Sequence, residues 1–373
     1  MVVYGLSTYL LWFSEKVKKN QRRWVEYFVI FILCLLAGLR SEDVGTDMEN
    51  YFVPLIEAAQ KSNSYTDYLS STWSYGWALR NTREFEVGFR LFVYMISKLF
   101  RSTVVVQFAV QLLIIGPVYV ALKRRKDIPL WFGMLVYLLI FNNLSFNAIR
   151  QAIAQSLTLL SFQLWTEGNK KKALLVMASG CLFHLSALIG FGILLIYEMV
   201  QRDQGRALKV CGIRIDARYA NMVLVIVGVL LFVLGANFVA SFLNTFFRGK
   251  FSSYISGNLV FMPNQLIKLL LPLAMMILNF RDMEHHSDMA RFNLCAVIIS
   301  ILLLQFTSVY AFSTRIADYF MYFGIFSYPQ VCKRGKLTGL LALIMVGYLV
   351  FYWVFYFGIG NSGETIPYTT IFG

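Results

Sequence analysis

Long apolar runs alternate with short polar and basic segments along almost the whole chain. The opening run, 2–13, is short, and the next extends from 24 to 39. Further apolar runs lie at 104–122, 129–146, 149–166, 173–184, 186–200, 220–241, 263–280, 292–309, 315–331 and 337–357. A helix that crosses the hydrocarbon core of a bilayer needs about 20 mainly apolar residues. The pattern therefore predicts an all-α polytopic membrane protein with roughly 10–12 transmembrane helices.

Two places interrupt the regular succession of apolar runs. The stretch 173–200 is too long for one crossing and too short for two full ones, and His184 lies near its middle. We expect a short hairpin of helices there, which reaches an outer cavity. The stretch 141–147 is polar and turn-like, directly before Arg150. Irregular backbone at membrane depth is tolerated only where it lines a cavity or packs within protein, so both places indicate a candidate site.

The longest polar segment, 40–86, leads into an apolar stretch, 85–100, that carries Glu86, Arg90 and Lys98. If this stretch crossed the membrane, the later basic loops would lie on the opposite side from the earlier ones. We therefore interpret it as an amphipathic helix that lies on the outer membrane surface.

Composition excludes two broad classes of protein. The chain is 58% hydrophobic and only 14% charged, whereas an ordinary soluble domain has about 45–50% apolar and about 25% charged residues. A water-soluble domain of this composition would have too few charged residues to cover its surface. The chain is also too hydrophobic to be disordered, because disordered chains are rich in polar and charged residues. The net charge of +14 does not indicate a nucleic-acid partner, because the basic residues lie in clusters between apolar runs.

That clustering is typical of the positive-inside rule. It places the first basic loop, 16–23, in the cytoplasm and the loops 40–103 and 242–262 outside. We expect a single integral membrane domain, 1–373, with a polar C-terminal tail, 358–373, that lies outside and is partly mobile. The five cysteines are scattered without a CxxC or Cys/His spacing. Neither a metal site, a disulfide framework nor a cofactor is indicated.

Charged groups inside or at the edges of membrane spans are costly and are functional candidates by default. In this topology they gather on the outer side, and no comparable set of paired charges enters from the cytoplasmic side. The candidates are Asp47, Tyr51, Glu86, Arg90, Arg150, Gln151, His184, Arg248, Arg315, Asp318 and Tyr319. Several arginines with few carboxylates suit an anionic ligand, because guanidinium matches phosphate oxygens with forked donors.

The obvious anion at this depth is the diphosphate of a polyprenyl lipid. Sugar transfer from such a lipid needs stabilisation of the departing diphosphate, which arginine can provide. It also needs a base for the acceptor hydroxyl, which a carboxylate or a neutral histidine can provide. Each candidate has a purely structural alternative. Arg150 and Arg315 could be interface anchors, His184 could bond a neighbouring carbonyl, Asp47 could cap a helix, and Glu86 could pair with nearby arginines on a solvated face.

Four stretches taken in order resemble the EpsG family of polysaccharide polymerases, which is related to the Wzy-type O-antigen and exopolysaccharide polymerases. They are Gly-Thr-Asp-Met-Glu-Asn-Tyr at 45–51, Ile-Arg-Gln at 149–151, His-Leu-Ser at 184–186 and Arg-Ile-Ala-Asp-Tyr at 315–319. The acidic start of the surface helix matches less well, because the family often has Glu-Pro where this chain has Glu86 followed by Val87. The resemblance covers most of the chain.

The resemblance implies a membrane glycosyltransferase of the GT-C type with a cavity at its outer face. Such proteins join oligosaccharide repeat units, carried on undecaprenyl diphosphate, at the periplasmic side of the bacterial inner membrane. On this basis Arg150 and Arg315 would hold the donor diphosphate, and Asp47 or His184 would be the base. The substrate-binding set would be Tyr51, Glu86, Arg90, Gln151, Arg248, Asp318 and Tyr319. Expected partners are the lipid-linked oligosaccharide, membrane lipid, a flippase and a chain-length regulator, and no nucleic acid.

Three other functions stay open at this point. A lipid-linked oligosaccharide flippase predicts charges along a path through the midplane and often internal repeats, and the chain shows neither. A sugar O-acyltransferase would need its histidine near a cytoplasmic acyl donor, whereas His184 is assigned to the outer side. An O-antigen ligase has nearly the same chemistry as a polymerase, and the residues do not separate the two.

Overall fold

The structure is a computed structural model, almost entirely helical, that divides into two compact units. Unit 1 comprises Met1–Leu188 and Leu349–Gly373, and unit 2 comprises Ile189–Tyr348. Each unit is described by itself. The residues that the structure describes are 1–202, 208–210, 213–235, 238, 245, 260–287, 289–310, 312–332 and 338–372.

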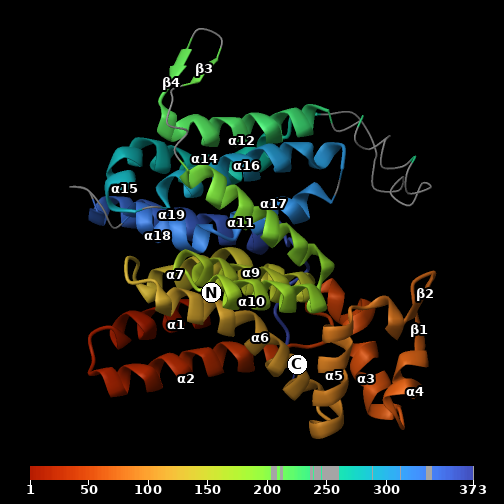
Figure 1. The fold of residues 1–373 in the computed structure, drawn as a ribbon. Helices are drawn as coiled ribbons and strands as arrows, with labels where there is room; N and C mark the ends of the chain where they lie inside the picture. Colours follow the sequence, from red (N-terminus) through yellow and green to blue (C-terminus); the bar gives the residue numbers. More distant parts are fainter. Residues whose placement is uncertain are drawn as a thin grey trace. The chain divides into compact units, whose positions relative to one another are not determined.

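Unit 1 is built around a bundle of apolar helices (Figure 1). Its members are α1 (Val2–Ser14), α2 (Lys19–Gly38), α6 (Thr103–Arg124), α7 (Leu130–Val136), α8 (Asn142–Asn147), α9 (Ile149–Thr166) and α10 (Lys170–Phe183). Helix α9 packs against both α6 and α10. Gly180 of α10 makes room for the turn that follows this helix, because an added Cβ would lie 3.2 Å from the Cβ of Ala187.

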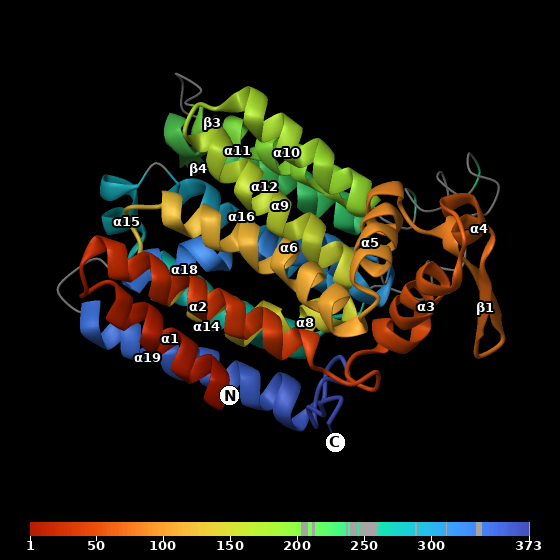
Figure 2. The ribbon, with the colours of Figure 1, turned by 90° about the horizontal axis from the view of Figure 1, so that it is seen from below.

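A smaller set of elements lies at one end of this bundle, as Figures 1 and 2 both show. In chain order it consists of a π-helical turn (Met48–Phe52), α3 (Val53–Lys61), α4 (Tyr65–Ser70), β1 (Thr72–Tyr75), β2 (Ala78–Asn81), a 3-10 turn (Thr82–Glu84) and α5 (Val87–Phe100). The two strands form an antiparallel hairpin in which Thr72 pairs with Asn81. Helix α5 runs across the direction of α9 and α10 in both views.

Helix α5 is apolar on two faces. Phe89 and Val93 are buried against the unit, and α5 packs on α3. Val87, Met95 and Leu99 are exposed and recur at helical spacing. This second stripe is the kind of face that the predicted surface helix requires, but its position on a membrane surface stays a prediction.

Unit 2 is a second helical bundle centred on α16 (Ala290–Gln305), which packs against α12 (Ala217–Leu234), α14 (Pro263–Leu278) and α17 (Ser313–Met321). Its other elements are α11 (Leu188–Gln201), β3 (Leu208–Val210), β4 (Ile213–Ile215), α15 (Phe280–His286), α18 (Gly324–Cys332) and α19 (Thr338–Trp353), which runs on into unit 1 through a π-helical segment (Val354–Ile359). Phe292 of α16 is fully buried and meets Tyr197 and Phe323 edge to face.

Five helical segments in the described parts of the chain are long and apolar enough to cross a membrane. They are Thr103–Arg124, Leu130–Asn147, Ala217–Leu234, Ala290–Ser308 and Thr338–Ile359. The prediction of an all-α polytopic membrane protein is therefore confirmed. The larger number of crossings and the GT-C arrangement stay predictions. So do the single domain and the outer loop at 40–103, and most of the second loop, 242–262, lies outside the described residues.

The structure has the predicted helix break at His184, but the break before Arg150 lies at another residue than predicted. Helix α10 ends at Phe183, and a 3-10 turn (Leu185–Ala187) separates it from α11, so His184 lies at a helix break. The polar stretch before Arg150 was predicted to be a turn, and this is wrong. Asn142–Asn147 is helical because Tyr4, Thr365 and Trp353 give its asparagines hydrogen-bond partners, and the chain breaks only at Ala148.

A second set of paired charges was not predicted from the sequence, and the side of the membrane on which either set lies stays a prediction. Glu26 of α2 is completely buried near the basic loop 16–23. It accepts hydrogen bonds from Lys123, Arg22 and Tyr119. The sequence did not reveal this cluster, because Lys123 and Glu26 are 97 positions apart.

The C-terminal tail is held along the end of α2 rather than free. Ser41 donates its N–H to the carbonyl oxygen of Thr369, and Ile371 donates to that of Leu39. Gly45 donates to the carbonyl oxygen of Glu364 at 3.0 Å. These bonds tie the tail to the loop that carries Asp47.

Candidate functional site

Three of the predicted residues meet in unit 1 around the carboxylate of Glu86. Glu86 precedes the first turn of α5, Arg150 lies in the first turn of α9, and His184 lies at the break after α10. Oε1 of Glu86 is 2.7 Å from Nδ1 of His184, and Oε2 is 2.5 Å from Nη1 of Arg150. One carboxylate thus joins an imidazole and a guanidinium from three segments of the chain.

A glycine makes this meeting possible. Gly88 lies in the first turn of α5, and an added Cβ there would lie 2.7 Å from the carbonyl oxygen of Leu182. That distance is shorter than real Cβ contacts permit. Any other residue would push α5 away from the end of α10 and separate Glu86 from His184.

The charges of the cluster determine its protonation state. Burial by itself would raise the pKa of Glu86, but the hydrogen bond with His184 and the positive charge of Arg150 outweigh it and hold the pKa at about 2. Glu86 is therefore ionised at neutral pH and can only accept hydrogen bonds. It follows that Nδ1 of His184 carries the proton in this contact. In the neutral imidazole the lone pair is then on Nε2.

Arg150 is held by aromatic rings as well as by Glu86. Its guanidinium carbon lies 4.9 Å from the ring centre of Phe85 and 5.1 Å from that of Tyr51. Cation–π contacts of this kind position a guanidinium without using its N–H groups. Nε of Arg150 is buried and has no hydrogen-bond partner in the described part of the chain. A buried donor without a partner is rare and calls for an explanation such as an absent ligand.

Asp47 lies beside this cluster and has structural partners. Its Oδ2 accepts from the Tyr51 hydroxyl at 2.5 Å and from the backbone N–H of Ile149 at 3.1 Å. A carboxylate at the start of a helix satisfies a free N–H and interacts favourably with the helix dipole. Burial and the neighbouring Asp47 charge raise the pKa of Tyr51 well above its usual value, so Tyr51 stays a donor to Asp47.

The loop that carries Asp47 depends on two residues that sequence reasoning did not single out. Gly45 has a φ of +94°, and an added Cβ would lie 2.7 Å from the carbonyl oxygen of Phe146. Oδ1 of Asn147 accepts from the backbone N–H of Thr46 at 2.6 Å. The Gly-Thr-Asp order in the sequence could have pointed to Gly45, whereas nothing local points to Asn147.

Arg40 is a third residue that the sequence analysis missed. It is 3% exposed, and its Nε and Nη1 have no hydrogen-bond partner within the described residues. The guanidinium lies over the ring of Phe146, 4.5 Å from its centre. Burial lowers the pKa of Arg40 to about 10, against the raising effect of Tyr368, Asp47 and Tyr51, so it stays charged at neutral pH. An arginine after an apolar run looks like an ordinary interface anchor, which is why it was passed over.

Two further predicted residues lie on the same elements as the cluster. Gln151 follows Arg150 in α9 and is 5% exposed. Arg90 lies one turn after Glu86 in α5 and donates from Nη1 to the carbonyl oxygen of Arg83 at 3.3 Å. Arg90 is thus directed to the 3-10 turn that precedes α5.

The remaining predicted residues belong to unit 2 or are not described. Arg315, Asp318 and Tyr319 lie on α17, where Tyr319 is buried and Arg315 is exposed. Asp318 is half-buried, with Lys268 of α14 and Arg315 as its electrostatic partners. These three residues belong to the other unit from Glu86. Arg248 lies outside the described residues.

The donors of the cluster suit an anion and a proton transfer better than a metal ion. Glu86, Arg150 and His184 include one carboxylate and one permanent cation, and a guanidinium is not a metal ligand. In the part of the chain that the structure describes, no three His, Cys, Asp or Glu side chains converge as a metal site.

Comparison with known proteins supplies the family. Comparison with curated proteins finds no match, and comparison with solved structures finds none either. The profile of the EpsG family matches residues 23–370, which is nearly the whole chain. The matched region includes every residue of the Glu86 cluster and all of α17. The chain belongs to the EpsG family.

Proposed function

We propose that this protein is a membrane glycosyltransferase that polymerises lipid-linked oligosaccharide repeat units. Membership of the EpsG family points to a polysaccharide polymerase in general terms. The observation that carries the specific proposal is the Glu86 carboxylate, which contacts both an imidazole and a guanidinium. A base and a group that binds phosphate are the two components that sugar transfer from a lipid diphosphate needs.

In the proposed reaction Nε2 of His184 accepts the proton of the acceptor hydroxyl. The hydroxyl oxygen forms a bond to the anomeric carbon of the donor sugar. The bond between that carbon and the diphosphate oxygen breaks, and its electron pair leaves with the diphosphate. The N–H groups of Arg150, including the unpartnered Nε, stabilise the charge that develops there. The products are an elongated chain, a free lipid diphosphate and a protonated imidazole.

The geometry favours His184 over Asp47 as the base. Oδ2 of Asp47 already accepts from Tyr51 and from the start of α9, whereas His184 keeps one ring nitrogen for a substrate. Glu86, which the sequence assigned to substrate binding, has both oxygens engaged by protein groups. We assign it to positioning: an ionised carboxylate fixes the tautomer of its histidine and stabilises the imidazolium that forms.

Several parts of the proposal rest on the resemblance alone. These are the undecaprenyl-diphosphate carrier, the periplasmic face of the bacterial inner membrane, and the work with a flippase and a chain-length regulator. Arg315 keeps its proposed role as a second phosphate-binding guanidinium, with Asp318 and Tyr319 beside it on α17. Arg248 keeps its proposed role in substrate binding.

The test is the length profile of surface polysaccharide on a gel, in cells that carry His184→Gln in place of the native chain. We expect single repeat units on the final acceptor and no ladder, because flipping and ligation continue while polymerisation stops. The matched control is His285→Gln, since His285 is exposed in α15 and belongs to unit 2. A normal ladder in the His184 variant at equal protein level would contradict the proposal.

The same gel separates the alternatives in cells that lack the gene. Finished polymer that stays on the lipid carrier would identify a ligase. Repeat units confined to the cytoplasmic side of the membrane would identify a flippase. A normal ladder with altered acetylation would identify a sugar O-acyltransferase.

A further inference from the structure

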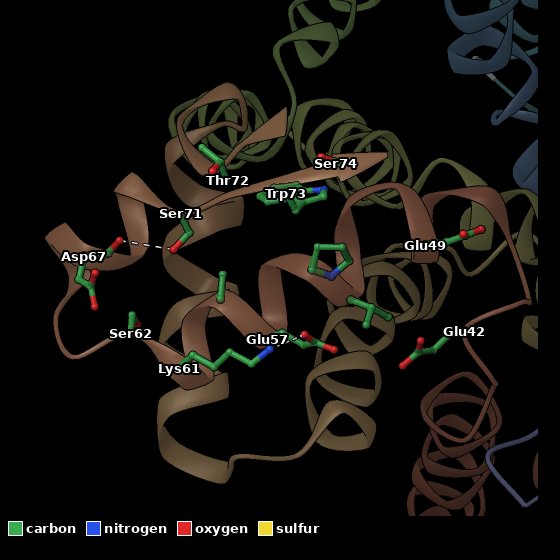
Figure 3. A pocket seen from close by; sticks show the side chains of 13 residues that line it. Glu42, Glu49, Glu57, Lys61, Ser62, Asp67, Ser71, Thr72, Trp73 and Ser74 are labelled. Atoms are coloured by element: carbon green, nitrogen blue, oxygen red, sulfur yellow. Dashed lines mark hydrogen bonds and ion pairs between the residues drawn. The ribbon is translucent and has the colours of Figure 1, made fainter. Parts of the chain in front are cut away.

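The elements beside the Glu86 cluster border an open cavity of about 650 Å³. Its walls are formed by the segment before α3, by α3 itself, by α4 and by β1, and Figure 3 shows the side chains that line it. Small-molecule sites in proteins have volumes of about 300–1,000 Å³ and combine apolar surface with a few placed polar groups. This cavity has both, because Trp73 and Val53 line it together with carboxylates and hydroxyls.

Trp73 is held in a fixed position at the cavity wall. Its Nε1–H donates to the carbonyl oxygen of Asn50 at 2.9 Å. One face stacks on Phe85, with ring centres 6.0 Å apart and planes inclined by 14°. The polar edge and one face are therefore occupied, and the side chain still lines the cavity. A fixed indole face with hydroxyl and carboxylate acceptors around it suits a sugar ring, which has apolar C–H faces and a polar rim.

The charge of the cavity is opposite to that of the whole chain. Glu42, Glu49, Glu57 and Asp67 line it, and Lys61 is its one positive side chain. Lys61 is paired with Glu57 at 2.8 Å, so the remaining carboxylates are not neutralised by it. The chain as a whole carries a net charge of +14. An acidic cavity on a basic protein repels anionic ligands and accepts neutral or positively charged ones.

Phe85 connects the cavity to the Glu86 cluster. Its ring stacks on Trp73, which lines the cavity, and lies 4.9 Å from the guanidinium carbon of Arg150. Glu49, which also lines the cavity, lies in the same π-helical turn as Tyr51, which contacts Asp47. The two stacked rings thus lie between a ligand in the cavity and Arg150, so the two sites are neighbours and not one site.

We propose that this cavity is a binding site for an oligosaccharide that lacks acidic groups, with Trp73 as its stacking platform. Its place in the reaction, which rests on the proposed function, is to hold the sugar chain near His184 between transfers. The carboxylates accept hydrogen bonds from hydroxyl or amino groups and exclude uronic acids. The saccharide selectivity of the protein would then lie partly in the segment 42–74.

Binding to the full-length protein in lipid nanodiscs tests this without any turnover. The probes are maltohexaose, a chitosan hexamer, fragments of the polysaccharide from the source cells, and an oligogalacturonate of equal length. Calorimetry should show binding of at least one non-acidic probe and none of the oligogalacturonate. Trp73→Ala should weaken that binding about tenfold. Trp77→Ala is the matched control, because Trp77 is in the same hairpin but is wholly exposed and does not line the cavity.

Further variants keep the test decisive if Trp73→Ala does not fold. Trp73→Phe should retain most of the binding affinity. The double variant Glu49→Gln, Glu57→Gln should reduce the difference in affinity between the neutral probes and the oligogalacturonate. Equal weakening by the Trp73 and Trp77 variants, tight binding of oligogalacturonate, or no binding of any non-acidic probe would each overturn the proposal. These outcomes are independent of the His184 gel result, so failure of the binding site and failure of the polymerase proposal can be told apart.

Discussion

Two carboxylates in unit 1, those of Glu26 and Glu86, lie between positively charged side chains, and they differ in their exposure to solvent and in their hydrogen-bond partners. Glu26 is 0% exposed and accepts four hydrogen bonds, two from Lys123 and one each from Arg22 and Tyr119. The side chain of Glu86 is 21% exposed and accepts from His184, from Arg150 and, at 3.4 Å, from the backbone N–H of Leu185. The carboxylate of Glu26 is therefore closed to a ligand, whereas that of Glu86 keeps solvent access and lies beside the buried, unpartnered Nε of Arg150.

This difference shows that a buried carboxylate between cations is not by itself a sign of an active site. A fully buried carboxylate holds helices together, because removal of a cation beside it leaves its charge buried without full compensation. A partly exposed carboxylate beside a buried donor without a partner can respond to a ligand. Both clusters contain a glutamate and a guanidinium, so residue type does not separate them, whereas the exposure of the carboxylate does.

The largest expected effect is on the rate of polymer formation, when Glu86 and Glu26 are each replaced by glutamine. Glu86→Gln should reduce polymer formation about 10³-fold, because the neutral amide no longer fixes the tautomer of His184 or stabilises its charge. Glu26→Gln should instead reduce the free energy of unfolding by about 1–3 kcal/mol, because the cations that it leaves without a counter-charge, Arg22 and Lys123, are 33% and 30% exposed. The measurements are polymer yield per molecule of folded protein and thermal unfolding in detergent. Equal loss of specific activity in the two variants would remove the distinction between the clusters.

The second largest effect is on polymer formation when the arginine that contacts each glutamate is replaced by lysine. Arg150→Lys keeps the charge but loses the planar fork and the unpartnered Nε, so polymer formation should fall about 10²-fold. Arg22→Lys is the control in the other cluster and should leave polymer formation within about twofold of the native level. Chain-length gels at matched protein level measure both. Near-normal chain length in the Arg150 variant would exclude Arg150 from the mechanism.

A smaller effect is expected at Asp47, which supports the site without performing the proton transfer in our proposal. Asp47→Asn retains an acceptor for Ile149 and Tyr51 but loses the charge at the start of α9. The free energy of unfolding should fall by about 1 kcal/mol, and polymer formation should fall about tenfold through displacement of Arg150. Complete loss of polymer from a stable Asp47 variant would instead assign the base to Asp47.

The last effect, which leaves polymer formation at neutral pH unchanged, is the pH dependence of stability that Glu86 contributes. The pKa of Glu86 is about 2 in the folded protein and 4.5 without its partners. A carboxyl with a lowered pKa stabilises the fold fully above its unfolded pKa and loses this contribution as the pH falls toward the folded value. Above about pH 5 the stability difference between the native protein and Glu86→Gln should thus contain the full contribution of the Glu86 charge. This contribution should be lost between about pH 4.5 and 2, as followed by thermal unfolding. A difference that does not change between pH 4.5 and 2 would contradict the assignment.

Much of the fold could be predicted, because hydrophobic runs are a local property. The apolar pattern identified the helices α6, α9 and α16 and the break at His184. The break before Arg150 was misplaced, because the asparagines at 142 and 143 bond to Tyr4, Thr365 and Trp353 from distant parts of the chain. Local polarity suggested a turn, and tertiary partners made the segment helical.

The candidate site was predicted as a set of residues and not as an arrangement. Charged and polar groups in an apolar chain are few, so Asp47, Glu86, Arg150 and His184 could be selected from the sequence. Their arrangement around the Glu86 carboxylate could not be predicted, because Glu86 is 64 positions from Arg150 and 98 from His184 in the sequence. Arg40 and the buried Glu26 cluster were missed for the same reason, since their environment comes from other segments.

The sequence by itself determined that the chain is an all-α membrane protein of the EpsG family, with scarce charges in identifiable places. The physical reason is that transfer of apolar and charged groups into a bilayer depends on residue type and local run length. Only the tertiary structure decided which carboxylate is fully buried and which keeps solvent access, and that a cavity adjoins the site. Burial and concavity depend on which distant segments meet, and this close packing is not recorded in any local pattern.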